Sequence, residues 1–337
     1  MHAMTSAVTL METEARETHL RVAEQFAANA PLVADLVARL KAKPPKFIMV
    51  VGRGSSDHAG VFAKYLIEIE IGIPVFAAAP SVATVYGKTL ALDDAMVLVI
   101  SQSGRSPDLL AQTELAKRSG AYCVALVNDE ASPLAQMVDF VLPLRAGKER
   151  SVAATKSYLA TLACVLQLTA SWSGSALLAQ AVAALPAALA TVCDSPAQLG
   201  VEDLTGVDHL VTLGRGLGFA ISKEMALKLK EVCNIHAEAF SSAEFLHGPV
   251  ALVNRALTVI DITIKDESEQ AHLAQVQELR KRGASLVHLN QVLADAHPRI
   301  APLLLLQRFY IDVAAAAVAM GLNPDQPTGL KKVTETL

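Results

Sequence analysis

The sequence has few aromatic and few charged residues, which make up 4% and 18% of its 337 positions. Acidic and basic residues nearly balance, 33 against 29, so the formal charge is −4, and no long run of like charge occurs. A dedicated nucleic-acid binder needs clustered cations that displace counterions, so this composition argues against a nucleic-acid partner. The low charge is consistent with a second subunit that covers part of the apolar surface.

The four cysteines, Cys123, Cys164, Cys193 and Cys233, are far apart and form no Cys-x-x-Cys pair. This spacing argues against a disulfide framework or a structural zinc site and favours free thiols in a reducing compartment. The first fourteen residues lack the basic start, apolar run and cleavage site of a secretory leader. We therefore expect a cytoplasmic protein.

One short motif raises the possibility of a metal site. His236-Ala237-Glu238 matches the first part of the zinc deaminase signature. That site also needs a later Pro-Cys-x-x-Cys, and no cysteine follows Cys233 in this chain. We expect neither a metal ion nor another cofactor.

One long stretch, residues 157–193, contains no charged residue. A membrane-spanning helix needs about 20 mostly apolar residues in one run. Here polar residues such as Gln167 and Gln180 interrupt the stretch, Ser173-Gly174-Ser175 breaks it, and Pro186 lies further on. We expect two buried helices and no membrane span.

The aliphatic content is high: the hydrophobic fraction is 52%, enough for a large core, and the length fits about two domains. Apolar residues at helical spacing predict helices at 12–41 and 55–71. Short apolar runs predict strands at 46–51, 73–77, 95–100, 122–127 and 140–144. Strands that alternate with helices predict a parallel sheet covered on both faces, the doubly wound α/β class.

The same alternation recurs in the second half of the chain. Predicted strands at 209–213, 256–264 and 284–289 alternate with helices that end near 231 and 282, and Gly-Arg-Gly turns begin at both Gly52 and Gly214. We interpret this as an internal duplication of one α/β unit. The predicted organisation is a helical segment at 1–43, a first domain at 44–193, a second domain at 194–320 and an irregular tail at 321–337.

A serine-rich loop, Ser101-Gln102-Ser103-Gly104-Arg105-Ser106, follows a predicted buried strand and opens a helix. Hydroxyls and backbone N–H groups at a helix N-terminus can bind an anion, although serines there often only cap the helix. Ligands of α/β sheets bind at the carboxyl ends of strands, which favours a phosphate site. Ser55-Ser56 follows another strand and can face the same crevice. The Gly-Arg-Gly turns lack the third glycine spacing of a dinucleotide fold.

A second region, residues 228–249, concentrates acids, bases and histidines in a chain with little charge. A buried carboxylate near cations can carry a proton during catalysis. The alternative interpretation is a solvated helix end with a core histidine.

Several motifs occur in a characteristic order along the chain. Together they resemble the isomerase half of the glutamine–fructose-6-phosphate aminotransferases, which consists of two tandem sugar-isomerase (SIS) domains, each a mostly parallel, flavodoxin-like sheet flanked by helices. The resemblance runs from about Pro44 to the end. The motifs are Ser101-Gln102-Ser103-Gly104, Ala153-Ala154-Thr155-Lys156, Leu227-Lys228-Leu229-Lys230-Glu231, Ile235-His236-Ala237-Glu238-Ala239, His247-Gly248-Pro249 and Asp325-Gln326-Pro327.

The sequence also departs from this family. The aminotransferases carry a glutaminase domain with a cysteine nucleophile at its start, whereas position 2 here is His2 and the first cysteine is Cys123. Smaller departures are Arg105-Ser106 where the family usually has Glu-Thr, and Ala154 where it has Ser. The missing glutaminase start indicates a stand-alone isomerase layout, as in some amino-sugar phosphate deaminases and deglycases. The smaller departures leave the exact substrate open.

The resemblance implies roles for individual residues. Glu231 matches the glutamate that moves a proton between C1 and C2 of the open-chain sugar. His247 matches the histidine that opens the sugar ring and is supplied by the neighbouring subunit, which implies a homodimer with shared sites. Lys332 matches the tail lysine that reaches the sugar carbonyl and can form a Schiff base.

Other matches imply substrate contacts. Lys228 matches a lysine beside the catalytic glutamate, and Val152 matches a position that contacts the sugar through its backbone. The implied phosphate loop and further substrate contacts comprise Ser101, Gln102, Ser103, Ser106, Ser55 and Ser56.

We therefore expect an enzyme that acts on a phosphorylated amino sugar or ketose phosphate. The expected net reaction is glucosamine 6-phosphate plus water giving fructose 6-phosphate plus ammonia. A galactosamine-6-phosphate deaminase, a fructosamine-6-phosphate deglycase and another aldose–ketose isomerase remain open. So do a synthase subunit fed by a separate glutaminase and, outside catalysis, a sugar-phosphate sensor.

Overall fold

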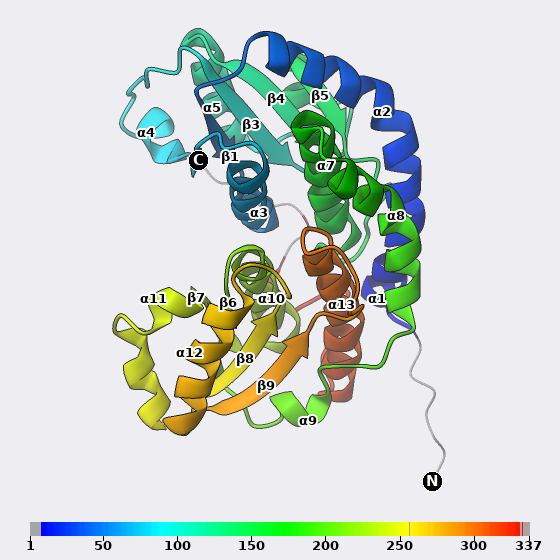
Figure 1. Ribbon diagram of the computed structural model, residues 1–337, viewed down its shortest axis with the longest axis vertical. Coiled ribbons are helices and arrows are strands. Elements are labelled where there is room, and N and C mark those ends of the chain that lie inside the picture. Colours follow the sequence, from blue (N-terminus) through cyan, green and yellow to red (C-terminus); the bar gives the residue numbers. More distant parts are fainter. Residues whose placement is uncertain (1–7, 256, 331, 333–337) are drawn as a thin grey trace. The chain divides into compact units, whose positions relative to one another are not determined.

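The computed structural model describes residues 8–255, 257–330 and 332 (Figure 1). These residues form two compact units. The first-sheet unit comprises His19–Lys148 and Lys156–Pro186; the second-sheet unit comprises the described residues of 8–18, 149–155 and 187–332. Each unit has its own parallel sheet.

The first-sheet unit contains five parallel strands in the order β2-β1-β3-β4-β5. This is the flavodoxin-like order, and it confirms the predicted doubly wound fold. Every residue of the central strand β3 is buried, because helices cover both faces of such a sheet. The strands are β1 (Phe47–Val51), β2 (Val75–Ala77), β3 (Ala95–Ser101), β4 (Tyr122–Val127) and β5 (Phe140–Pro143).

The helices around this sheet begin where the sequence predicts turns or prolines. Three of them, α4, α5 and α6, start with a proline in the first turn, where the missing N–H costs nothing. They are α2 (Thr18–Ala42), α3 (Ser55–Glu70), α4 (Pro80–Thr84), α5 (Pro107–Arg118), α6 (Pro133–Met137) and α7 (Lys156–Ser173). The single helix predicted at 12–41 is divided at Glu17, so that α1 (Leu10–Arg16) precedes α2.

The second-sheet unit contains four parallel strands in the order β7-β6-β8-β9. This order corresponds to β2-β1-β3-β4 of the first sheet. The strands are β6 (His209–Gly214), β7 (His236–Ser241), β8 (Thr258–Thr263) and β9 (Ser285–Asn290). The prediction did not include β7, an edge strand that lies inside the charged 228–249 region. The other elements are α9 (Val201–Leu204), α10 (Leu217–Cys233), α11 (Ser242–Phe245), the 3₁₀ helix Pro249–Arg255, α12 (Glu269–Lys281) and α13 (Ala301–Ala319).

The two Gly-Arg-Gly turns have the same backbone geometry. Gly54 has φ 54° and ψ −129°, and Gly216 has φ 55° and ψ −125°, a conformation that disfavours side chains. A Cβ on Gly52 or Gly214 would lie 2.8 or 2.5 Å from the backbone of the following helix. The shared turn and the shared strand order together support the internal duplication.

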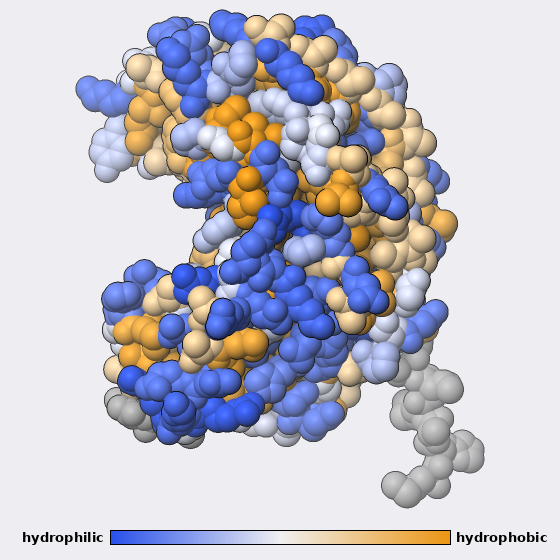
Figure 2. Space-filling view, in the orientation of Figure 1, coloured by the Kyte–Doolittle hydropathy of each residue, from blue (hydrophilic) through white to orange (hydrophobic). Residues whose placement is uncertain are grey.

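The prediction of two buried helices in 157–193 is correct for α7 and wrong for α8 (Ala176–Cys193). Only 33% of α8 is buried, against 89% of α13, and by length and composition alone both could cross a membrane. Figure 2 shows the exposed part of α8 mostly in the hydrophobic colours. Its exposed face consists largely of alanines, whose small side chains lose little free energy by facing water.

A buried carboxylate ties together three elements of the second-sheet unit. Asp261 on β8 accepts hydrogen bonds from His272 Nε2 and His288 Nδ1, each at 2.7 Å. Because Arg280, which can only donate, lies 2.7 Å from His288 Nε2, His288 carries its proton on Nδ1. Burial raises the pKa of Asp261, but the hydrogen bonds from the two imidazoles outweigh it and leave that pKa below its ordinary value.

Asp261 is therefore expected to stabilise the fold near neutral pH. A lowered folded-state pKa adds stability above the unfolded value of about 3.9, and that stability is lost as the pH falls through the folded value. We expect Asp261→Asn to lower the free energy of unfolding by about 1.5–3 kcal/mol at neutral pH, and by less in acid. Urea unfolding at both pH values measures this, with the exposed Asp295→Asn as control. An equal loss at both pH values would contradict it.

Candidate active site

The serine loop lies at the carboxyl end of β3, between that strand and α5. Ser101 Oγ accepts the Gly104 N–H at 3.0 Å, and Ser103 Oγ accepts the Arg105 N–H at 3.3 Å, so the loop folds tightly on itself. Ser106 precedes α5, but its side chain makes no capping hydrogen bond. The alternative in which these serines merely cap the helix therefore does not describe this loop.

Ser55 and Ser56 lie at the same edge of the first sheet as the serine loop. They begin α3, directly after β1, and β1 pairs in parallel with β3, with Val51 opposite Val99. The carboxyl ends of the two strands are therefore neighbours. Ser55 and Ser56 therefore begin at the same edge of the sheet as the serine loop, in which Gln102 lies between Ser101 and Ser103.

Two arginines brace the serine loop, and the prediction assigned no role to either. Arg53 Nε donates to the buried carboxylate of Asp108 at 2.7 Å, and Arg105 Nη2 donates to Asp129 at 2.7 Å. The hydrogen bond from Arg105 lowers the pKa of Asp129. Both guanidinium groups remain about half exposed, with side-chain exposures of 54% and 55%. The Gly-Arg-Gly turn was the sequence signal for Arg53.

In the second-sheet unit, one face of α10 carries an ammonium between two carboxylates. Lys228 Nζ lies 3.3 Å from Glu224 and makes a shorter hydrogen bond to Glu231. The spacing i, i+4 and i+7 places all three on one helix face. Burial would lower the pKa of Lys228, but the two carboxylates outweigh it and raise that pKa, so the lysine stays charged. Glu231 is 22% exposed, whereas Glu224 is fully buried.

His247 lies in the turn after α11, with its side chain exposed. Its backbone N–H donates to the Glu244 carbonyl at 2.9 Å. Within the part of the chain that the structure describes, His247 makes no hydrogen bond or ion pair with Glu231 or Lys332. Among the described residues of one chain, no hydrogen bond or ion pair therefore links this imidazole to the other two predicted catalytic residues.

Lys332 lies against the loop 149–155 of the same unit. Its Nζ donates to the Glu149 carboxylate at 3.0 Å and to the Ser151 carbonyl at 2.7 Å. Val152, the predicted sugar contact, is the next residue, and its N–H donates to the Asp325 carbonyl at 3.0 Å. The tail lysine and the Val152 backbone are thus neighbours.

Three acids that organise this region were not predicted as site residues: Glu14, Glu149 and Asp325. Glu14 accepts hydrogen bonds from the backbone of Arg150 and Ser151 and from the Ser151 hydroxyl. Asp325 accepts the N–H groups of Leu10 and Met11 at 2.9 and 2.8 Å, which caps α1. Of the three acids, Asp325 had a signal in the sequence, because it belongs to the motif Asp325-Gln326-Pro327 on which the family resemblance rests.

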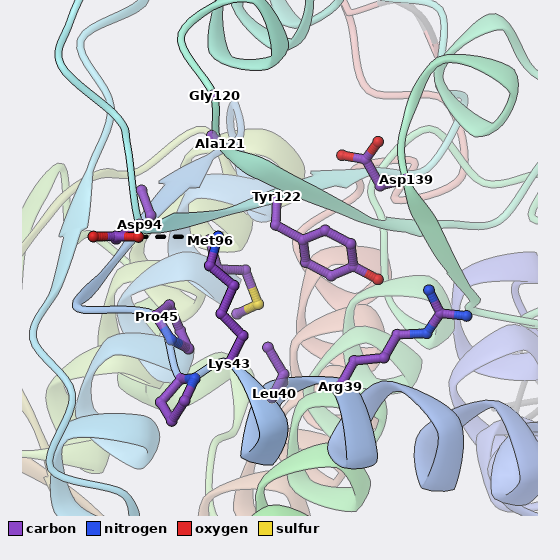
Figure 3. A pocket seen from close by; sticks show the side chains of 12 residues that line it. Arg39, Leu40, Lys43, Pro45, Asp94, Met96, Gly120, Ala121, Tyr122 and Asp139 are labelled. Atoms are coloured by element: carbon purple, nitrogen blue, oxygen red, sulfur yellow. Dashed lines mark ion pairs between the residues drawn. The ribbon is translucent and has the colours of Figure 1, made fainter.

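A pocket of about 390 Å³ opens at the opposite edge of the first sheet, at the amino ends of β3 and β4 (Figure 3). Its carboxylates are already paired: Asp94 with Lys46 at 2.8 Å, and Asp139 with Lys117 at 3.0 Å. Ligands of doubly wound sheets bind at the carboxyl ends of the strands. We therefore assign this pocket no part in the chemistry.

Residues 43–171 and 203–296, more than half of the chain, match the family model described as the SIS domain. The chain belongs to the SIS domain family. Each matched segment contains one of the two parallel sheets. The two sheets of this SIS chain therefore follow one another along the sequence, as expected.

Relatives of this SIS chain confirm the resemblance to the aminotransferases. The glutamine–fructose-6-phosphate aminotransferase (isomerizing) of Symbiobacterium thermophilum is 31% identical over 311 residues, which cover 85% of this chain and 51% of that protein. The SIS chain thus spans about half the length of the curated relatives it matches.

Solved structures agree with this placement. The crystal structure of a candidate phosphosugar isomerase from Silicibacter pomeroyi is 38% identical, with a TM-score of 0.88 over 94% of this chain and 100% of the other. The C-terminal domain of the glucosamine–fructose-6-phosphate aminotransferase from Francisella tularensis is 26% identical, with a TM-score of 0.81 over 97% and 100%. The SIS chain thus has the fold of an aminotransferase isomerase domain.

Proposed function

We propose that this SIS chain catalyses aldose–ketose isomerisation of a phosphosugar. The observation that carries the proposal is the partly exposed carboxylate of Glu231, held beside the buried ammonium of Lys228. An isomerisation through an enediol or enolamine needs one base that removes a proton from one carbon and returns it to the next. A carboxylate that is fixed by an ammonium and still open to a ligand suits that task.

The proposed roles of the other residues rest on their match to the family motifs. The serine loop (Ser101, Gln102, Ser103 and Ser106), with Ser55 and Ser56, binds the sugar phosphate at the carboxyl edge of the first sheet. His247 opens the sugar ring, and the Val152 backbone orients the open chain. Glu231 then moves a proton from C2 to C1.

We propose the specific net reaction glucosamine 6-phosphate plus water giving fructose 6-phosphate plus ammonia. Proton transfer from C2 to C1 of the amino aldehyde produces an imine at C2. The Lys332 ammonium passes a proton to the imine nitrogen, and the amine that remains replaces ammonia on this carbon. Water then releases the ketose and regenerates the lysine ammonium. Water is the solvent and free ammonia is dilute, which favours the hydrolytic direction. The similarity to enzymes that make an amino-sugar phosphate supports this substrate class.

Catalysis is favoured over a sensor role by the second-sheet unit. Phosphate recognition alone would need only the serine loop. Burying a lysine between two carboxylates costs free energy of desolvation, and phosphate recognition does not need that arrangement. We propose a cytoplasmic homodimer with shared active sites, which uses no cofactor and binds neither nucleic acid nor membrane.

A panel of 6-phosphosugars tests the proposal. Glucosamine, galactosamine, fructosamine and glucose 6-phosphates are each incubated with the protein, and ammonia and ketose are measured separately. We expect equal amounts of ammonia and fructose 6-phosphate from glucosamine 6-phosphate, and neither above background from a Glu231→Gln variant prepared in the same way. Ketose without ammonia would restrict the function to isomerisation. No product from any sugar would contradict the enzyme proposal.

A further inference from the structure

The amine of Lys332 has two partners in the second-sheet unit. The Glu149 carboxylate lies 3.0 Å from Nζ and the Ser151 carbonyl 2.7 Å from it. The Glu149 side chain has no exposed surface, whereas the lysine side chain is 27% exposed. A carboxylate without access to water needs hydrogen bonds or a countercharge, and the lysine ammonium supplies both.

Glu149 is itself held in a fixed position. Its Oε1 accepts the Thr155 backbone N–H at 2.9 Å, while Oε2 faces Lys332. The loop 149–155 is anchored separately by the Glu14 carboxylate, which binds the backbone of Ser151. The carboxylate of Glu149 is therefore a rigid anchor point, because neither its own side chain nor its loop can move away easily.

We propose that Glu149 is the positioning residue of Lys332. A free lysine side chain samples many rotamers, and an amine that must meet one carbon atom reacts faster when it is held near that atom. Glu149 keeps the amine at the loop that carries Val152, the sugar-contact residue. This inference rests on the proposed function of Lys332. Glu149 acts on the reaction through the lysine and does not contact the substrate.

The first test needs no substrate. Reductive methylation labels lysine amines, and mass spectrometry measures the rate at Lys332 relative to the exposed Lys230. Loss of a charge-assisted hydrogen bond in Glu149→Gln should raise the Lys332 rate about tenfold. Glu149→Asp, which keeps the charge but is one methylene shorter, should give an intermediate rate. Glu267→Gln, which removes the ion pair with Arg299 elsewhere in this unit, should leave it unchanged.

The second test is a double-mutant cycle on turnover. If Glu149 acts through Lys332, Glu149→Gln lowers kcat about tenfold or more with little change in KM, and has no further effect in a Lys332→Ala background. An equal loss of activity in both backgrounds would show a merely structural role and overturn the inference. So would an unchanged labelling rate at Lys332 in both Glu149 variants.

The two proposals fail in different ways. Wild-type turnover by Lys332→Ala would remove the lysine from the proposed mechanism, and with it the catalytic part of this inference. The labelling experiment would still decide whether Glu149 holds the amine. If Glu149→Gln does not fold, the Glu149→Asp variant supplies both readouts.

Discussion

Replacing Glu231 with glutamine is expected to lower the rate of phosphosugar isomerisation by about 10²–10⁴-fold, the usual contribution of a general base. Glutamine has nearly the same size and can still accept a hydrogen bond from Lys228, but it cannot take up the proton from C2. The fold and the affinity for phosphate should therefore persist. Steady-state kinetics measure the rate, and titration with inorganic phosphate measures the binding.

Glu224 provides a matched control on the same helix. It contacts the same lysine at 3.3 Å and accepts a hydrogen bond from Tyr310 at 3.3 Å, but its side chain has no exposed surface to meet a ligand. Glu224→Gln should lower the unfolding free energy by about 1–3 kcal/mol and the rate by less than about tenfold. Equal rate losses in both variants would mean that the disturbed Lys228 causes the effect. Near-normal turnover by Glu231→Gln would remove this residue from the mechanism.

Mixing two inactive variants is expected to restore activity if the site spans two chains. The resemblance implies that His247 serves the neighbouring subunit, and this histidine is exposed. A two-fold interface is self-complementary, so each subunit would complete the other's site. In a heterodimer of Glu231→Gln and His247→Ala, one site then carries both defects and the other carries neither.

The size of the recovery follows from counting sites. Random exchange of equal amounts makes half of the dimers mixed, each with one intact site, so activity should reach about one quarter of the wild-type value. Subunits with different affinity tags, together with size-exclusion chromatography, establish that exchange took place. If activity stays at the level of the separate variants after proven exchange, both residues serve one chain's site. That result would reject the shared site and leave the isomerase proposal intact.

Local sequence was sufficient for most of the fold. The apolar runs that become β1, β3 and β4 are short, β-branched and bounded by glycine or polar residues, and such runs become strands in any α/β context. The repeated Gly-Arg-Gly turn predicted the duplication, because the backbone geometry at Gly54 and Gly216 disfavours side chains. The family resemblance implied that Lys228 lies beside Glu231, and their spacing on one helix face accounts for the contact that the structure shows.

Local sequence was insufficient where burial depends on what packs nearby. The charge-free α8 was predicted to be buried, yet its alanine face is exposed, because composition does not say which side of a helix meets the core. The edge strand β7 lies within a region whose charges suggested a helix end. The spacing of apolar residues cannot distinguish an edge strand from a helix end when polar residues occupy the exposed edge.

The contacts that organise the tail lysine were decided only by tertiary structure. Glu149 and Lys332 are 183 positions apart, and Glu14 lies 137 positions from Ser151. Asp261 meets His272 from α12 and His288 from β9 in the same way. Residues so far apart in sequence leave no periodic or spacing signal, because their approach depends on how separate elements pack. The residue types of the site could therefore be predicted, while the partners that hold them in place could not.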